Sequence, residues 1–192
     1  MEKMAAITPS EKPYMDTSVL TLWKHRIPWL LLLMVSATFT GIIITRFEHA
    51  LAAYVALTAY IPMLMDTGGN CGSQSSTSII RSLSLGQIRF RDTGRVLWKE
   101  IRVAALCGVT MGAVNFAKLL VFDRVGLTVA AVVCLTLVVV ALAAKTVGCL
   151  LPIAAKRLGA DPAVMASPLL TTVVDALALL VYFRFASLLL PM

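Results

Sequence analysis

Residues 125–144 read VGLTVAAVVCLTLVVVALAA, a stretch without a charged side chain. A helix needs roughly 20 apolar residues to cross the hydrocarbon core of a bilayer, so this stretch predicts a transmembrane helix. Four other apolar runs approach or exceed that length, and they cover residues 27–44, 50–65, 103–121 and 162–190. The sequence therefore predicts an all-α membrane protein with five transmembrane helices per protomer.

The composition agrees with a membrane protein and excludes several other classes. Of the 192 residues, 59% are hydrophobic and 14% are charged, and the mean hydropathy is +0.87. Soluble domains are less apolar and far more charged. Five spans use about half of the chain and leave no room for a soluble catalytic domain. The net charge of +7 therefore indicates basic cytoplasmic loops rather than a nucleic-acid partner.

The basic residues orient the predicted helices. Twelve of them fall on one side of the five spans and four on the other. The first group comprises Lys3, Lys12, Lys24, Arg26, Arg81, Arg89, Arg91, Arg95, Lys99, Arg102, Lys156 and Arg157, and the second comprises Arg46, Lys118, Arg124 and Arg184. By the positive-inside rule the N-terminus is cytoplasmic and the C-terminus lies outside the cell membrane.

Two regions are expected along the chain. Residues 1–24 form a short cytoplasmic tail or an interfacial helix, because 14–26 has amphipathic character. Residues 25–192 form a five-helix transmembrane domain. A secretory signal peptide is not expected, because the first apolar run is too long and no small-residue cleavage site follows it.

A polar segment interrupts the second apolar run. Residues 62–77 read PMLMDTGGNCGSQSST. Pro62 removes a backbone donor, and Gly68, Gly69 and Gly72 weaken a helix. Neutral oxygens then share one helical face, from Asn70, Ser73, Gln74 and Thr77. The segment is interpreted either as irregular backbone beside protein or water, or as the polar cytoplasmic end of a long helix.

The last apolar run contains an acid near its middle. Asp175 costs roughly 2.5–3.5 kcal/mol at a helix centre, so it should face the bundle interior or water. Thr171 and Thr172 precede it on the same face, and Pro168 frees the carbonyl of Val164. A structural ion pair with Lys145 is the alternative to a cation or proton site.

The oxygen-rich segments suit a hard cation such as magnesium, calcium, manganese or an alkali ion. The four cysteines share no ligand spacing and are interpreted as buried small apolar residues. In residues 103–121, Ala104, Gly108 and Gly112 form a smooth face for helix packing. Asn115 and Lys118 continue that face, and we expect them to hydrogen-bond to each other.

Linked motifs in this order resemble the membrane domain of the MgtE magnesium transporter family. The motifs are Pro62, the run Gly68-Gly69-Asn70-Cys71-Gly72-Ser73-Gln74, Arg81, Leu85-Gly86-Gln87-Ile88, Gly148, Leu151-Pro152, Lys156-Arg157, Asp161-Pro162-Ala163-Val164, Pro168, Thr171-Thr172 and Asp175. The similarity runs from about residue 20 to the end of the chain. The best-known members of this family carry cytosolic regulatory domains before the first span, whereas about 24 residues precede the first span in this sequence.

The resemblance implies a homodimer with a pore on its two-fold axis, lined by the second and fifth helices of both chains. It implies magnesium as the transported ion, with no cofactor. Asp175 corresponds to the central acid, Asn70 faces the same pore and Asp161 lies at the cytoplasmic mouth. The pore-lining residues expected beside them are Gly68, Gly69, Ser73, Gln74, Val164, Pro168, Thr171 and Thr172.

For three further acidic residues the sequence allows two alternative roles. Asp66, one turn before the glycines, either adds a metal ligand in the pore or is solvated. Glu100 and Asp92, with Asp161, either bind cytosolic magnesium and close the pore or pair with neighbouring basic residues.

The leading hypothesis is therefore divalent-cation transport, with magnesium held as a hydrated ion. A sodium- or proton-coupled exchanger of the same fold is the main alternative. An intramembrane aspartyl enzyme using Asp66 or Asp175 and a structural membrane subunit are weaker ones. The chain is not expected to be an enzyme.

Overall fold

The computed structural model describes residues 13–163 and 168–191, and in that part of the chain all regular structure is helical. Short 3-10 helices lie before α1, α3 and α4. In chain order the elements are η2 (Tyr14–Asp16), α1 (Val19–Arg46), α2 (Glu48–Ala53), η3 (Val55–Tyr60), α3 (Ile61–Ser84), η4 (Phe90–Asp92), α4 (Thr93–Val121), α5 (Leu127–Arg157) and α6 (Pro168–Leu189).

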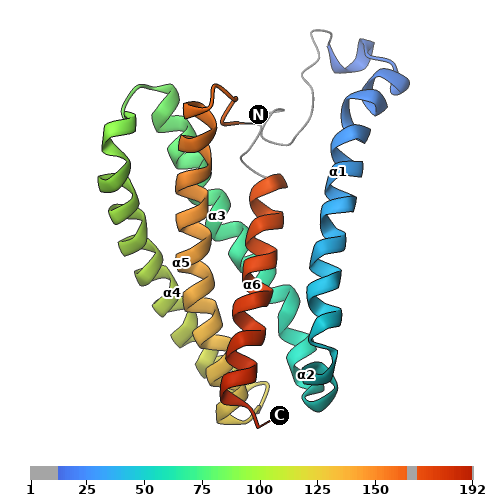
Figure 1. Cartoon of the computed structure of the whole chain (residues 1–192), viewed down its shortest axis with the longest axis vertical. Coiled ribbons are helices and arrows are strands. Elements are labelled where there is room, and N and C mark those ends of the chain that lie inside the picture. The colour runs from blue at the N-terminus through green and yellow to red at the C-terminus, as the bar shows by residue number, and fades with distance from the viewer. Residues whose placement is uncertain (1–12, 164–167, 192) are drawn as a thin grey trace.

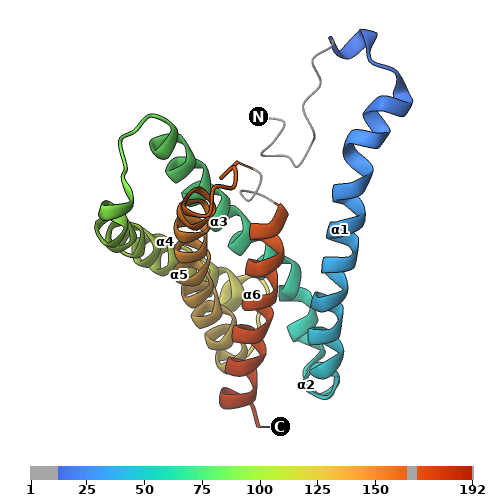
Figure 2. The same cartoon turned by 45° about the horizontal axis from the view of Figure 1, so that its top comes forward.

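The long helices form a bundle in which consecutive members run in opposite directions (Figure 1). Helix α5 packs against α3, α4 and α6, and α6 also contacts α1. Helix α1 stands along one flank of the bundle in both views (Figure 2). None of the side chains in its apolar window is buried, so α1 presents its surface to lipid or to another subunit.

Four helical segments of the described chain are long and apolar enough to cross a membrane. They are Val19–Arg46, Phe90–Val121, Leu127–Arg157 and Leu169–Leu189. These segments contain the predicted runs 27–44 and 103–121 and most of 125–144 and 162–190, which confirms the all-helical membrane class. The residues from Val19 to Arg26, part of the segment expected to be a tail or an interfacial helix, form the first turns of α1.

The second predicted span is not one helix. Residues 50–65 divide among α2, η3 and the first turn of α3. Pro62 lies in that first turn, where its missing N–H needs no partner, so the chain turns before Pro62 rather than after it. Irregular backbone after Pro62 was therefore a wrong prediction, because α3 continues as a helix from Ile61 to Ser84.

Residues before α6 also differ from the prediction. Pro162 lies in a turn after α5, and α6 as described begins at Pro168. The expected role of the Val164 carbonyl lies outside the described residues, as does the side chain of Pro168.

The largest core cluster fixes the chain that leads into α3. Leu57 and Tyr60 of η3 are buried together with Tyr182 and Phe183 of α6. The Tyr182 hydroxyl donates to the carbonyl oxygen of Leu57 at 3.0 Å. The ring of Phe47 stacks on Phe183 with centroids 4.6 Å apart. The start of α3 is thereby held against α6.

Glycines set the approach of α5 to its neighbours. A Cβ on Gly148 would collide with the backbone of Gly72, so α3 and α5 cross with their backbones in contact. A Cβ on Gly108 would lie 3.1 Å from the Cα of Val138, and Ala104 is fully buried. The predicted packing face of residues 104–112 is therefore confirmed.

The predicted Asn115–Lys118 hydrogen bond is wrong, because the two residues have other partners. The Asn115 amide donates to Cys134 Sγ at 3.8 Å, whereas Lys118 Nζ lies 2.8 Å from an oxygen of Asp123. All four cysteines are free. Cys71, Cys134 and Cys149 are buried, in agreement with their interpretation as small apolar residues, whereas Cys107 is only partly buried.

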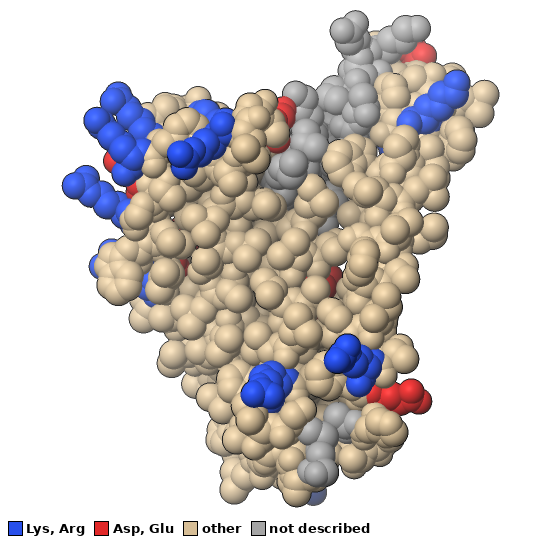
Figure 3. All heavy atoms as spheres, viewed as in Figure 1, with Lys and Arg blue, Asp and Glu red and all other residues tan. Residues whose placement is uncertain are grey.

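Lys and Arg gather at the end of the bundle that holds the turn between α3 and α4 and the end of α5 (Figure 3). Smaller groups lie toward the other end of the same face. We call the first end the basic end of the bundle. It contains Arg81, Arg89, Arg91, Arg95, Lys156 and Arg157.

Candidate cation site

Two helices bring oxygen-bearing side chains to one cavity. On α3, Asp66, Asn70 and Ser73 are spaced by four and three residues and therefore share a face. On α6, Thr171 and Asp175 are spaced by four. Both sets line a cavity of about 310 Å³, together with Met65 and Gly69. This cavity is called the cation cavity below.

The donors in the cation cavity are those that a hard cation prefers. They comprise the carboxylates of Asp66 and Asp175, the amide of Asn70 and the hydroxyls of Ser73 and Thr171. The Asn70 amide nitrogen donates to Asp66 Oδ2 at 3.1 Å, so the amide oxygen is left to accept a bond or to bind a cation. Within residues 13–163 and 168–191, no three His, Cys, Asp or Glu side chains form a metal-binding group.

The structure separates the residues that were expected to line a pore. Gly69, Ser73 and Thr171 line the cation cavity, and Thr172 is not among its lining residues. Gly68 lies instead in helix packing, since a Cβ there would be 2.8 Å from methyl groups of Val140 and Val174. Gln74 lies beside a different cavity, where it contacts Lys145.

Lys145 is not the partner of Asp175. It is buried on α5, with 4% of its surface exposed, and its ammonium donates to the amide oxygen of Gln74 at 3.4 Å. The alternative of a structural ion pair between Asp175 and Lys145 is therefore wrong. Asp175 instead lines the cation cavity together with Asp66 and neutral oxygen donors.

The three acids proposed for gating belong to the half of the bundle near its basic end. Glu100 accepts a hydrogen bond from the hydroxyl of Ser75 at 2.5 Å. Asp92 accepts one from the backbone N–H of Arg89, and Asp161 accepts one from the backbone N–H of Ala163, each at 3.0 Å. Neither Glu100 nor Asp92 forms an ion pair with any Lys or Arg that the structure describes.

Sequence reasoning missed two polar contacts between helices. One is the Ser75–Glu100 hydrogen bond between α3 and α4, and the other is the Lys145–Gln74 bond between α5 and α3. The available signal was the presence of Lys145 at the end of a long apolar run, where it requires a polar partner. Glu100 gave no such signal, because Lys99 and Arg102 are close to it in the sequence. The rotation of α3 about its axis decides which partner each one meets.

A helical membrane protein with carboxylate, amide and hydroxyl oxygens around one cavity between two helices has the architecture of a cation transporter. The family model MgtE, described as a divalent cation transporter, matches residues 61–185. The chain belongs to the MgtE family.

Similar curated proteins carry the same family name. The magnesium transporter MgtE of Thermus thermophilus is 37% identical over 190 residues, which cover 99% of this chain and 42% of that protein. The magnesium transporter MgtE of Bacillus subtilis is 34% identical over 179 residues, which cover 90% of this chain and 38% of that protein. The chain thus spans about two fifths of the length of these relatives.

Proposed function

We propose that this chain carries magnesium across the cell membrane along a path lined by α3 and α6. The observation that carries the proposal is the cation cavity, which Asp66 and Asp175 line together with amide and hydroxyl oxygens. Membership of a divalent cation transporter family supports the same function. Magnesium is the ion named for the relatives from Thermus thermophilus and Bacillus subtilis.

We propose that α3 is a fifth membrane-spanning helix. It has 24 residues and is therefore about 36 Å long, which exceeds the hydrocarbon thickness. It runs from the end of the bundle where α1 stops to the end where α4 begins (Figure 1). Its buried face, which includes Gly68 and Gly72, packs against α5 and α6. Its exposed polar side chains, such as Asp66 and Asn70, would face water or another subunit. With the basic end in the cytoplasm, the N-terminus is cytoplasmic and the C-terminus lies outside.

The path is completed by a second copy of the chain. Asp66 and Asn70 line the cation cavity and are exposed in one protomer, so that wall of the cavity is incomplete. A two-fold axis beside α3 and α6 brings both copies of Asp175 to one place. Magnesium gives up its water reluctantly, so a hydrated ion held through water by these carboxylates suits a cavity of about 310 Å³.

The membrane potential supplies the driving force in this proposal. Moving two positive charges inward through 100 mV releases roughly 4.6 kcal/mol. Coupling to sodium or protons is the alternative, because the geometry of the cavity suits a channel and an exchanger equally. Asp161, at the basic end, is proposed to lie at the cytoplasmic mouth.

Flux into liposomes tests the function. We expect the purified chain to admit magnesium when a potassium diffusion potential, negative inside, is the only gradient applied. The measurement is the fluorescence of an enclosed magnesium indicator, with protein-free liposomes as the control. If entry requires an opposing sodium or proton gradient, the exchanger is correct. Absence of magnesium flux under every gradient contradicts the proposal.

Replacing Asn70 with Ala is expected to change selectivity more than assembly. The variant loses both the amide oxygen that faces the cation cavity and the hydrogen bond that positions Asp66. We expect the magnesium-to-calcium flux ratio to fall by about threefold or more, which corresponds to about 0.7 kcal/mol. Ser84→Ala, at the other end of α3, is the matched control. Unchanged ratios among magnesium, calcium and manganese would assign Asn70 to packing.

A further inference from the structure

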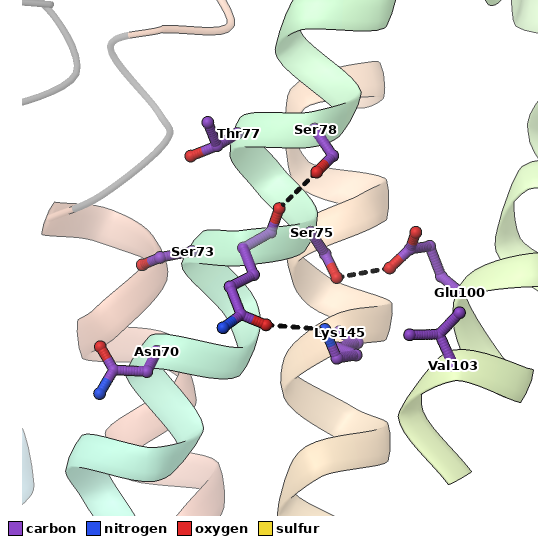
Figure 4. Close-up of a pocket in the computed structure, with 9 residues that line it drawn as sticks. Asn70, Ser73, Ser75, Thr77, Ser78, Glu100, Val103 and Lys145 are labelled. Carbon is purple, nitrogen blue, oxygen red and sulfur yellow. Dashed lines mark hydrogen bonds between the residues drawn. The ribbon is translucent and has the colours of Figure 1, made fainter. Parts of the chain in front are cut away.

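A second polar cavity lies on α3 next to the cation cavity. It has a volume of about 710 Å³ and is lined by Asn70, Ser73, Gln74, Ser75, Thr77, Ser78, Glu100, Val103 and Lys145. It shares Asn70 and Ser73 with the cation cavity. We call it the lysine cavity. In Figure 4, Asn70 and Ser73 point to one side of α3, and Glu100 and Lys145 lie on the other.

The lysine cavity lies within the membrane half that is nearer the basic end. Glu100 is seven residues from the start of α4 and Lys145 is 12 residues from the end of α5, or about 10 Å and 18 Å along their helices. Hydroxyl and charged groups at this depth require water or protein partners. The cavity is therefore suited to water, and its oxygens together with Glu100 would also suit a cation.

Lys145 supplies the feature that opposes a cation there. Its ammonium is directed at the amide oxygen of Gln74, an oxygen that would otherwise be available as a ligand. Glu100 accepts a bond from Ser75 rather than pairing with Lys145. The lysine cavity thus holds one positive and one negative side chain, so Lys145 offsets the attraction that Glu100 would exert on a mobile cation.

We propose that Lys145 is a tethered cation that keeps mobile cations out of the lysine cavity and confines them to the Asp175 side of α3. This makes Lys145 a positioning residue for Gln74 and a determinant of the ion path. The inference rests on the proposed transport function, because it assigns a boundary to the path. Removing the charge would convert the lysine cavity into a second cation site that uses Glu100.

Binding of Mn²⁺ to the full chain in detergent tests this role. Lys145→Met keeps the length and apolar stem of the side chain, and we expect it to bind about one additional Mn²⁺ per protomer, measured by electron paramagnetic resonance. Lys145→Arg retains the charge and should bind as wild type does. Glu100→Gln in the Lys145→Met background should remove the additional ion.

Flux provides a second readout. Because the like charge is lost, Lys145→Met proteoliposomes should leak sodium at least about tenfold faster than wild type. If the methionine variant does not fold, Lys145→Gln replaces it, since the amide keeps a hydrogen-bond donor for Gln74. A neutral variant that folds, binds no additional Mn²⁺ and leaks no more sodium overturns the proposal.

The test is independent of the Asp175 assignment. The additional Mn²⁺ should also appear when Lys145→Met is combined with Asp175→Asn, because the lysine cavity does not include Asp175. Gain of the ion in both backgrounds supports the role of Lys145 even if Asp175 proves unnecessary for transport. Loss of transport in Asp175→Asn without any gain in Lys145→Met supports the proposed function and overturns this inference.

Discussion

Asp175→Asn is expected to lower magnesium uptake into proteoliposomes by at least about tenfold while the protein still folds and assembles. Asparagine has almost the same volume as aspartate and keeps one side-chain oxygen, so packing of α6 should persist. The change removes one of the two carboxylates from the cation cavity. In a two-fold dimer it removes two negative charges from the path of a divalent ion.

The matched control for Asp175→Asn is Asp16→Asn, the same chemical change at an exposed position in η2. Magnesium flux and elution on size exclusion are measured for both variants. Unchanged flux in Asp175→Asn would contradict the site assignment. A protomer that no longer assembles, with Asp16→Asn intact, would favour the structural role of Asp175.

The sequence alone was sufficient to predict the apolar transmembrane helices, but it was not sufficient to predict α3 as a continuous helix. Runs such as 125–144 are uniformly apolar, and their length alone predicts a helix across the bilayer. Helix α3 combines an exposed polar face with a buried face of small residues, so its mean hydropathy does not predict a transmembrane helix. The proline and glycines, which were expected to interrupt this helix, have other structural roles. Pro62 begins the helix, and Gly72 permits contact with α5.

Some of the residues that line the cation cavity could be predicted from the sequence, and others could not. Spacing placed Thr171 and Asp175 on one face of the last helix, and Asn70 and Ser73, with Gln74 and Thr77, on one face of α3. It left the role of Asp66 open. Spacing does not state how far each helix is rotated. The rotation of α3 turns Gly68 toward Val140 and Val174. It also places Gln74, rather than Asp175, within hydrogen-bonding distance of Lys145.

Gly148→Ala is expected to destabilise the bundle by about 2 kcal/mol. The added methyl group would meet backbone atoms of Gly72, which have no rotamer to change, so α3 and α5 must separate. Overpacking of this kind costs up to about 3 kcal/mol, and the better helix propensity of alanine offsets about 1 kcal/mol of that. For a chain of this length the melting temperature should fall by roughly 4–8 °C.

The same displacement should impair transport, because the crossing of α3 and α5 holds the face of α3 that carries Asp66 and Asn70. Thermal unfolding in detergent, followed by circular dichroism, is compared with magnesium flux below the transition. Gly94→Ala is the matched control, since a Cβ there meets nothing within 4 Å, and its stability should stay within about 0.5 kcal/mol of wild type. Equal melting temperatures for Gly148→Ala and Gly94→Ala would mean that the backbones of α3 and α5 are not in contact at Gly72 and Gly148. The position of α3 beside α6 would then require another explanation.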